Sequence, residues 1–173
     1  MKVHSSGITN GHLDDRFGHH GEQFLHAKMP NRSFPLTWEN LPENTVSLAL
    51  TFIDYDAVPV CGFPWIHWTV ANIDPLFTGL SENASVELDL LEGVNSWSSG
   101  IIPESSRLSL TDSATYGGCA PPDKAHRYDL TLYALDTTLD LKRGFYLNEL
   151  LRAIDNHVLG QAQLSAHYTA KEK

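Results

Sequence analysis

The sequence has 173 residues, of which 42% are hydrophobic and 19% charged, and its formal net charge is −9. This length suits one sizeable core, so we expect a single domain over residues 1–173, with residues 1–30 as an irregular segment packed on it. The acidic balance opposes the basic face of nucleic-acid binders, and no stretch approaches the roughly 18 apolar residues of a spanning helix. Neither a nucleic-acid partner nor a transmembrane segment is expected.

The amino terminus and the cysteines both bear on the compartment. Residues 1–10 are polar and Gly-containing where an export signal needs an apolar stretch. Cys61 and Cys119 are too few for a disulfide framework, and we expect both to be reduced thiols. The predicted location is the cytoplasm.

Residues 1–30 are rich in Gly, His and Asp, a composition typical of a short strand and long loops. His19 and His20 lie near His12 and His26, as the residues of a metal-binding tract would. No cysteine or regular ligand spacing accompanies them, so a solvated loop is the favoured interpretation. No metal and no other cofactor is expected.

The strongest strand candidate covers residues 45–53. Its apolar residues alternate with small ones, which predicts burial on at least one side: Val46, Leu48, Leu50 and Phe52 against Ser47, Ala49 and Thr51. Asp54 and Asp56 follow where this run ends. In an extended chain, residues two apart point to the same side, so we expect the two carboxylates to form a pair.

A second strand is predicted over residues 62–73, which are rich in aromatic and β-branched residues. Strict alternation puts Trp65 and His67 on the face opposite Trp68, away from the most apolar side. Beyond it, Gly and Pro interrupt the pattern. One alternating piece at residues 85–90 predicts a further strand, and residues 95–97 are expected in a long surface loop.

The third important strand is predicted over residues 126–135, where His126 and Tyr128 share one face with Leu130 and Leu132. Leu147, Leu150, Leu151 and Ile154 then follow helical spacing, with Gly160 as a candidate residue after the helix end. A last strand is expected over residues 161–168. Many short strands and one late helix predict a mainly β fold, an antiparallel β-sandwich with few peripheral helices.

If these strand ends meet, four interpretations of the polar residues compete. Imidazoles, a phenol and loop N–H groups could form an anion pocket, with the carboxylates orienting the imidazoles. The same side chains could bind a metal or act as acid, base or nucleophile in a hydrolase-type enzyme. Each could also be only a satisfied hydrogen-bonding residue in a turn or at a sheet edge. Sequence spacing alone does not choose among them.

Four ordered motifs resemble the phosphatidylethanolamine-binding protein family, most closely its bacterial Raf-kinase-inhibitor-like branch: Asp54-Tyr-Asp-Ala57, Trp65-Ile-His-Trp68, Tyr116-Gly-Gly-Cys-Ala-Pro-Pro122 and His126-Arg-Tyr128. Further agreement lies in Ser33-Phe-Pro-Leu-Thr-Trp38, in Asn95-Ser-Trp97 and at His157, so the likeness extends from about Ser33 to Tyr168. The chain departs from the common pattern at Tyr55 and Val58, where the family has prolines, and at Cys119-Ala120.

The resemblance implies a β-sandwich with a shallow pocket for phosphate-like anions or phosphorylated head groups. By motif, the ligand-binding residues are Asp54, Asp56, Trp65, His67, Ala120, Pro121, His126 and Tyr128. We therefore expect a small-ligand binding protein in which His67, His126 and Tyr128 act as donors to the anion. A kinase-inhibitor-like regulatory role, a protein partner and a homodimer stay open. The alternatives are a hydrolase using the same pocket and an interaction module without a small ligand.

Overall fold

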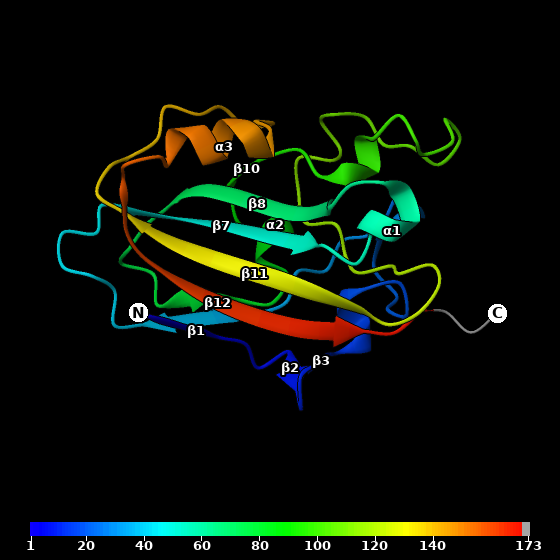
Figure 1. The fold of residues 1–173 in the computed structure, drawn as a ribbon, viewed down its shortest axis with the longest axis horizontal. Helices are drawn as coiled ribbons and strands as arrows, with labels where there is room; N and C mark the ends of the chain where they lie inside the picture. Colours follow the sequence, from blue (N-terminus) through cyan, green and yellow to red (C-terminus); the bar gives the residue numbers. More distant parts are fainter. Residues whose placement is uncertain (171–173) are drawn as a thin grey trace.

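Strand β7 (Ser47–Asp54) is the centre of the computed structural model, which describes residues 1–170 (Figure 1). All eight residues of this strand are buried. Leu50 and Phe52 face the main core, whereas Ala49 packs in a second cluster on the opposite face. The alternation of large and small residues thus predicted the strand, and the fold buries both of its sides.

The elements are few long strands, many short ones and small helices. The long strands are β7, β8 (Trp65–Ile73), β11 (His126–Leu135) and β12 (Val158–Tyr168). The short strands are β1 (Lys2–His4), β2 (Ile8–Thr9), β3 (His12–Leu13), β4 (Phe24–Leu25), β5 (Met29–Pro30), β6 (Leu36–Glu39), β9 (Gly79–Leu80) and β10 (Leu91–Glu92). The helices are α1 (Val58–Cys61), α2 (Ala84–Glu87), α3 (Leu147–Ala153) and the 3-10 turns η1 (Asp15–Phe17) and η2 (Ser96–Ser98).

The long strands form a seven-stranded sheet in the order β10-β8-β7-β11-β12-β3-β2. Its pairs are antiparallel except β12 with β3. A three-stranded sheet, β1-β6-β9, packs across one face, and the largest cluster of buried apolar side chains lies between the two sheets. The predicted mainly β, antiparallel sandwich with few helices is therefore confirmed, with one parallel pair at its edge.

Helix α3 covers the other face of the large sheet (Figure 1). Its Leu150 and the following Ile154 pack with Ala49, Ala71 and Phe145 in the second cluster. The helical spacing read from the sequence accounts for this contact, because residues three to four apart lie on one helix face. Gly160, however, lies inside β12, so the helix ends without it.

Two local predictions were wrong. The predicted strand at residues 85–90 does not form: residues 85–87 belong to the short helix α2, which follows Asn83 in a left-handed conformation at φ 65°, and the next strand begins at Leu91. The predicted surface loop at residues 95–97 is buried, because the Asn95 side chain accepts a hydrogen bond from Trp97 N at 3.0 Å and caps η2. The capped turn holds Trp97 against the large sheet. Alternation of residues along the sequence gives no sign of such a contact between distant segments.

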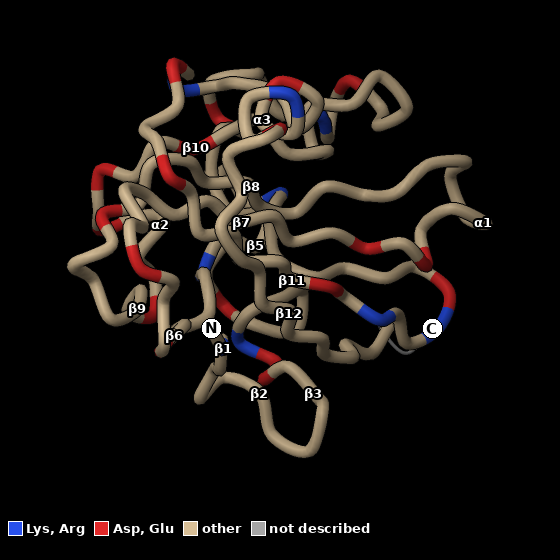
Figure 2. The backbone as a smooth tube through the Cα atoms, turned by 60° about the vertical axis from the view of Figure 1, so that its left-hand side comes forward, with Lys and Arg blue, Asp and Glu red and all other residues tan. Residues whose placement is uncertain are grey.

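The described chain has an acidic surface and, among its helices, none that could span a membrane. In the view of Figure 2, basic residues are isolated among more numerous acidic ones, in keeping with the net charge of −9. Within residues 1–170, none of the helices has the length and apolar character that crossing a bilayer requires. The predicted single domain also includes residues 171–173, which lie outside the described residues.

Candidate ligand-binding pocket

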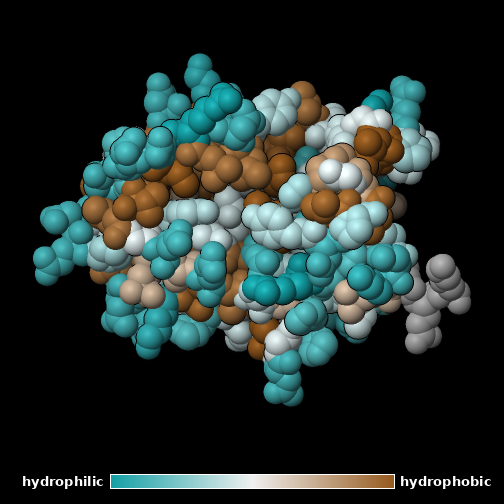
Figure 3. Space-filling view, in the orientation of Figure 1, coloured by the Kyte–Doolittle hydropathy of each residue, from teal (hydrophilic) through white to brown (hydrophobic). Residues whose placement is uncertain are grey.

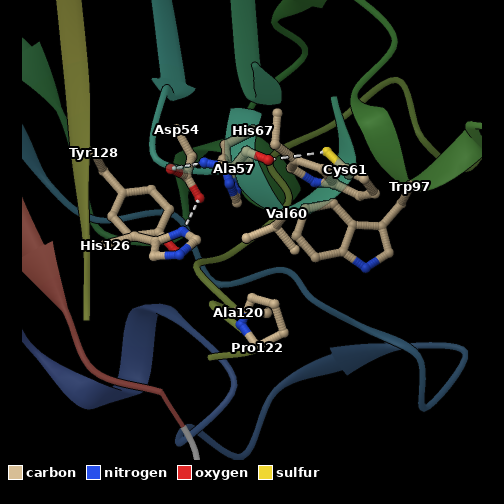
Figure 4. A pocket seen from close by; sticks show the side chains of 11 residues that line it. Asp54, Ala57, Val60, Cys61, His67, Trp97, Ala120, Pro122, His126 and Tyr128 are labelled. Atoms are coloured by element: carbon tan, nitrogen blue, oxygen red, sulfur yellow. Dashed lines mark hydrogen bonds and ion pairs between the residues drawn. The ribbon is translucent and has the colours of Figure 1, made fainter. Parts of the chain in front are cut away.

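A cavity of about 240 Å³ lies where the end of β7 meets the beginnings of β8 and β11 (Figure 4). Antiparallel pairing brings these ends together: Asp54 stands opposite Trp65 on one side and Tyr128 on the other. The lining residues are Asp54, Ala57, Val60, Cys61, Trp65, His67, Trp97, Ala120, Pro122, His126 and Tyr128. Six of the eight residues predicted from sequence line this cavity, and Asp56 and Pro121 do not.

His126 is clamped between two carboxylates. Its Nδ1 lies 2.7 Å from Asp54 Oδ2 and its Nε2 lies 2.8 Å from Asp123 Oδ1. A carboxylate accepts hydrogen bonds, so the two contacts are satisfied together when both ring nitrogens carry hydrogens. The His126 side chain is fully buried. His126 is therefore an imidazolium whose two N–H groups are already used within the protein.

The pKa shifts of this group follow from burial and charge. Burial lowers the pKa of His126, but the hydrogen bonds and charges of Asp54 and Asp123 outweigh it and leave the pKa above 6.5. Desolvation raises the pKa of Asp54 despite its contact with His126. The hydrogen bond from His126 lowers the pKa of the exposed Asp123 carboxyl. Asp123 precedes His126 by three residues, yet sequence analysis did not single it out.

His67 reaches the cavity through an irregularity in the sheet. Phe52 pairs with Trp68 and Ile53 with Ile66, so His67 is an extra residue on β8, a β-bulge. Its ring lies 5.7 Å from Phe52 and 5.0 Å from Tyr128. The expectation that His67 faces away from the apolar side is therefore wrong, because the bulge breaks the strict alternation on which it rested.

The hydrogen bond of His67 fixes its tautomer. Nδ1 lies 2.7 Å from the Gly117 carbonyl oxygen, which only accepts, so Nδ1 carries the hydrogen and Nε2 carries a lone pair. Nε2 is buried and has no hydrogen-bond partner among the described residues. Desolvation lowers the pKa of His67 from 6.5 to about 4, so the ring is neutral at pH 7. The predicted donor thus presents an acceptor to the cavity.

Tyr128 supplies the second unpaired polar atom. It is fully buried, and its hydroxyl oxygen has no hydrogen-bond partner at normal geometry within the described part of the chain, although the Ala120 backbone and the Cys119 thiol lie close enough to influence its pKa. Desolvation raises its pKa, so the hydroxyl stays protonated. A phenol both donates and accepts. His67 and Tyr128 both line the cavity, and the acceptor and the adaptable hydroxyl that they hold are buried in its wall.

A glycine pair holds the loop that orients His67. Gly117 N donates to the His67 carbonyl at 2.8 Å while its own carbonyl accepts from the His67 ring. A Cβ on Gly117 would lie 2.8 Å from Trp97 Cε3, and one on Gly118 would lie 2.6 Å from the Phe17 carbonyl oxygen. Such contacts exclude larger residues, so the Gly-Gly sequence allows the loop to approach the ring closely.

Apolar side chains form much of the remaining wall. Trp65 and Trp97 meet edge to face with ring centroids 5.5 Å apart. Val60 and Cys61 come from α1, whose Val58 and Val60 are 42% and 46% exposed. Figure 3 shows hydrophobic residues gathered over α1 on this face. The cavity therefore combines a polar base with an apolar rim.

The two predicted residues outside the lining have other surroundings. Asp56 is exposed and accepts a hydrogen bond from Arg127 N at 2.9 Å, which ties the turn after β7 to β11. Pro121 is buried, and the neighbouring Pro122 lines the cavity instead. The pairing of Asp54 with Asp56 is not found, because the chain turns after Asp54 and separates their surroundings.

The described residues offer little support for metal or thiol chemistry. Across residues 1–170, no group of three or more His, Cys, Asp and Glu side chains is arranged to hold a metal ion. Cys61 and Cys119 are both free. Burial raises the pKa of the Cys119 thiol well above its ordinary value, which disfavours the thiolate that a nucleophile requires.

Known proteins share this architecture. The family model of the phosphatidylethanolamine-binding proteins matches residues 4–169. YxkA of Bacillus subtilis, an uncharacterized protein, is 41% identical over 159 residues, which are 90% of this chain and 93% of YxkA. The crystal structure of CT736 from Chlamydia trachomatis, a putative phosphatidylethanolamine-binding protein homolog, has a TM-score of 0.77 at 26% identity and covers 99% of this chain and 97% of that one.

Escherichia coli YbcL, whose crystal structure is described as a new member of the mammalian family, has a TM-score of 0.76 at 26% identity, with 98% of both chains covered. The fold and its pocket thus define a class of β-sandwich with a small cavity at one end of its large sheet. The chain belongs to the phosphatidylethanolamine-binding protein family. The resemblance drawn from the sequence motifs is confirmed.

Proposed function

We propose that this chain binds a small phosphate-like anion or a phosphorylated head group in the cavity beside His126. The observation that carries the proposal is the pair of buried, unpartnered polar atoms, His67 Nε2 and Tyr128 Oη, in one cavity. Buried polar groups are normally hydrogen-bonded, so an unpaired set in a pocket supports an exchangeable partner. A volume of about 240 Å³ suits a ligand smaller than the drug-sized molecules that fill roughly 300–1,000 Å³.

The net charge of the chain is −9, so the support for an anionic ligand comes from groups in the cavity itself. The His126 imidazolium gives the cavity a positive group, and the Tyr128 hydroxyl gives it a donor. Trp65 and Trp97 could pack against an apolar group attached to the anion. The ligand class proposed is therefore an oxyanion with a small organic substituent.

Calorimetric titration with inorganic phosphate and phosphoethanolamine tests the proposal. Removing a hydrogen bond to a charged group costs about 1.5–3 kcal/mol, so Tyr128→Phe should weaken binding roughly 10- to 150-fold. The matched control is Tyr133→Phe, because Tyr133 lies on the same strand but lines a separate groove. Failure of the wild type to bind either compound would reject the proposal.

A regulatory protein-interaction role is the second candidate. Its supporting observation is the exposed apolar rim, in which Val58 and Val60 of α1 border the cavity region. A ligand in the cavity would lie beside this rim and could change what a protein partner meets. Substituting Val58, which does not line the cavity, with Ser should leave phosphate binding intact and weaken regulation of a kinase that the wild type inhibits. An unchanged inhibition would argue against this role.

The remaining alternatives have less support. A hydrolase would need an effective base or nucleophile, whereas His126 has both ring nitrogens bonded, burial lowers the pKa of His67 to about 4, and burial raises the pKa of the Cys119 thiol. The two free thiols agree with a reducing compartment, and we propose the cytoplasm as the location. Cell fractionation with an antibody to the chain checks this assignment.

A further inference from the structure

The cavity residues differ in whether they can donate a hydrogen bond, accept one or do neither, and this difference determines which protonation state of a ligand fits. His67 offers only a lone pair, because Nδ1–H is held by the Gly117 carbonyl at 2.7 Å. His126 offers no free N–H, because Asp54 and Asp123 accept from both of its nitrogens. Tyr128 offers a hydroxyl that can donate. A ligand that fits must therefore bring at least one hydrogen of its own.

The charges around the cavity point in the same direction. Its lining includes no Lys or Arg within the described residues. The positive charge of His126 is already opposed by Asp54 and Asp123. A fully ionised dianion would meet this negative surplus and the lone pair of His67 at the same time. A monoanion with one protonated oxygen halves the charge repulsion and replaces the clash at the His67 lone pair with a hydrogen bond.

The surroundings of His67 leave its Nε2 without a competing donor. Asp54 of β7, His126 and Tyr128 of β11, and Cys61 of α1 are the titratable groups that line the cavity with it. Cys61 Sγ is directed to the carbonyl oxygens of Ala57 and Phe63, each at 3.3 Å. The Trp97 ring of η2 lies edge-on at 5.3 Å, and the Gly117–Gly118 loop takes the other ring nitrogen. Cys119 behind Tyr128 is buried and neutral.

We infer that the pocket selects the protonated form of an oxyanion: the P–OH of a phosphomonoester monoanion donates to His67 Nε2, and an ionised oxygen of the same group accepts from Tyr128 O–H. His67 is then a specificity-determining residue rather than a positive anchor. The inference deepens the proposed function and rests on it. Sulfate has a similar shape but carries no hydrogen near neutral pH, so it leaves the His67 lone pair facing an oxyanion oxygen.

Two inorganic anions separate the possibilities in the intact chain. Phosphate and sulfate are titrated calorimetrically at constant ionic strength from pH ~5 to pH ~8.5, a range that brackets the phosphate second pKa of about 6–7. Each titration is repeated in two buffers of different ionisation enthalpy, which gives the number of protons taken up on binding. Phosphate affinity should stay constant at the acid end and fall about tenfold per pH unit above that pKa. Proton uptake per phosphate should rise from about zero to about one over the same range. Sulfate should bind at least ~100-fold more weakly at pH ~5.5, since sites built around a ligand hydrogen reject analogues without it.

A His67→Gln variant adds a second measurement, because its amide can donate as well as accept. It should narrow the preference for phosphate over sulfate by at least about tenfold, the scale of one hydrogen bond, while Tyr133→Phe leaves it unchanged. The wild-type titrations decide the question even where the variant does not fold.

The outcomes are distinct. Equal wild-type affinities for phosphate and sulfate without proton uptake would overturn the inference and leave the proposed function standing. Sulfate binding equal to phosphate with one proton taken up would place that proton on the protein, at His67 or His126, and also overturn the inference. No binding of phosphate, sulfate or phosphoethanolamine at any pH would overturn both.

Discussion

Replacing Tyr128 with Phe should stabilise the empty protein, although it removes a polar group from the binding pocket. The Tyr128 side chain is fully buried and its hydroxyl has no partner within residues 1–170. An unsatisfied buried polar group costs about 1–3 kcal/mol, so its removal should raise the free energy of unfolding by about 1 kcal/mol. For a domain of this size, that change raises Tm by roughly 2–4 °C.

Tyr116→Phe is the matched control. Tyr116 is equally buried, but its hydroxyl donates to the Phe17 carbonyl oxygen at 2.8 Å. Removing that hydroxyl leaves the carbonyl without this bond, so we expect a loss of about 1 kcal/mol. The two variants should therefore move the urea midpoint in opposite directions.

Chemical denaturation in phosphate-free buffer measures both effects, and repetition in phosphate adds the contribution of the ligand. Wild-type protein should gain stability from phosphate by mass action, whereas Tyr128→Phe should gain much less. A phosphate-free Tyr128→Phe protein that is less stable than wild type by 1 kcal/mol or more, on the scale of one hydrogen bond, would refute the reasoning. The hydroxyl would then have a partner in the empty state.

Three further outcomes concern the site and Glu92, a buried carboxylate outside it that accepts hydrogen bonds from Trp68 Nε1 and Ser85 Oγ. His126→Ala leaves the buried Asp54 carboxylate without its charge partner, so urea denaturation at pH ~7 should show a loss of about 3–5 kcal/mol, and a loss near zero would contradict the clamp. Desolvation raises the pKa of Glu92 to about 7, so ionisation of Glu92 lowers the stability of the fold as the pH rises from 4.5 to 7. Desolvation lowers the pKa of His67 to about 4, so protonation of His67 lowers the stability as the pH falls from 6.5 to 4. Each trend changes the free energy of unfolding by about 3 kcal/mol, and the two trends oppose each other. Glu92→Gln removes the first trend, so the variant should lose stability more steeply than wild type as the pH falls. An unchanged curve of stability against pH would contradict the raised pKa of Glu92. Gly117→Ala places a Cβ 2.8 Å from Trp97, so it should cost about 1–3 kcal/mol and weaken phosphate binding, whereas full affinity would show that the loop relaxes without moving His67.

Periodicity predicted the parts of the fold whose pattern is local. The alternation in β11 and the helical spacing of Leu150 and Ile154 match the burial of those residues, whereas β7 is buried on both faces and Leu151 is 45% exposed. The same argument failed for α2. Residues 85–90 alternate, yet Val86 N donates to the Asn83 carbonyl at 2.9 Å and begins a helical turn that the alternation does not describe.

The site was predictable in residue type more than in role. Motif order indicated Asp54, His67, His126 and Tyr128, and the structure places all four around one cavity. The β-bulge at His67 depends on how β8 pairs with β7, whereas the Asp123–His126 contact spans only three residues and lies before the first residue of the strand pattern. Spacing therefore does not tell which imidazole nitrogen is free, and that detail decides whether His67 donates or accepts.

The single parallel pair in the large sheet has a consequence for synthesis. His12 of β3 pairs with His167 of β12, and the β11 partner of β7 also comes late in the chain. During synthesis, β3 and β7 therefore leave the ribosome before their partners β12 and β11 have been made. One edge of each strand stays unpaired until then. Such distant pairings slow folding and expose strand edges. A nascent chain halted before residue 126 should need chaperone protection and should contain no pocket.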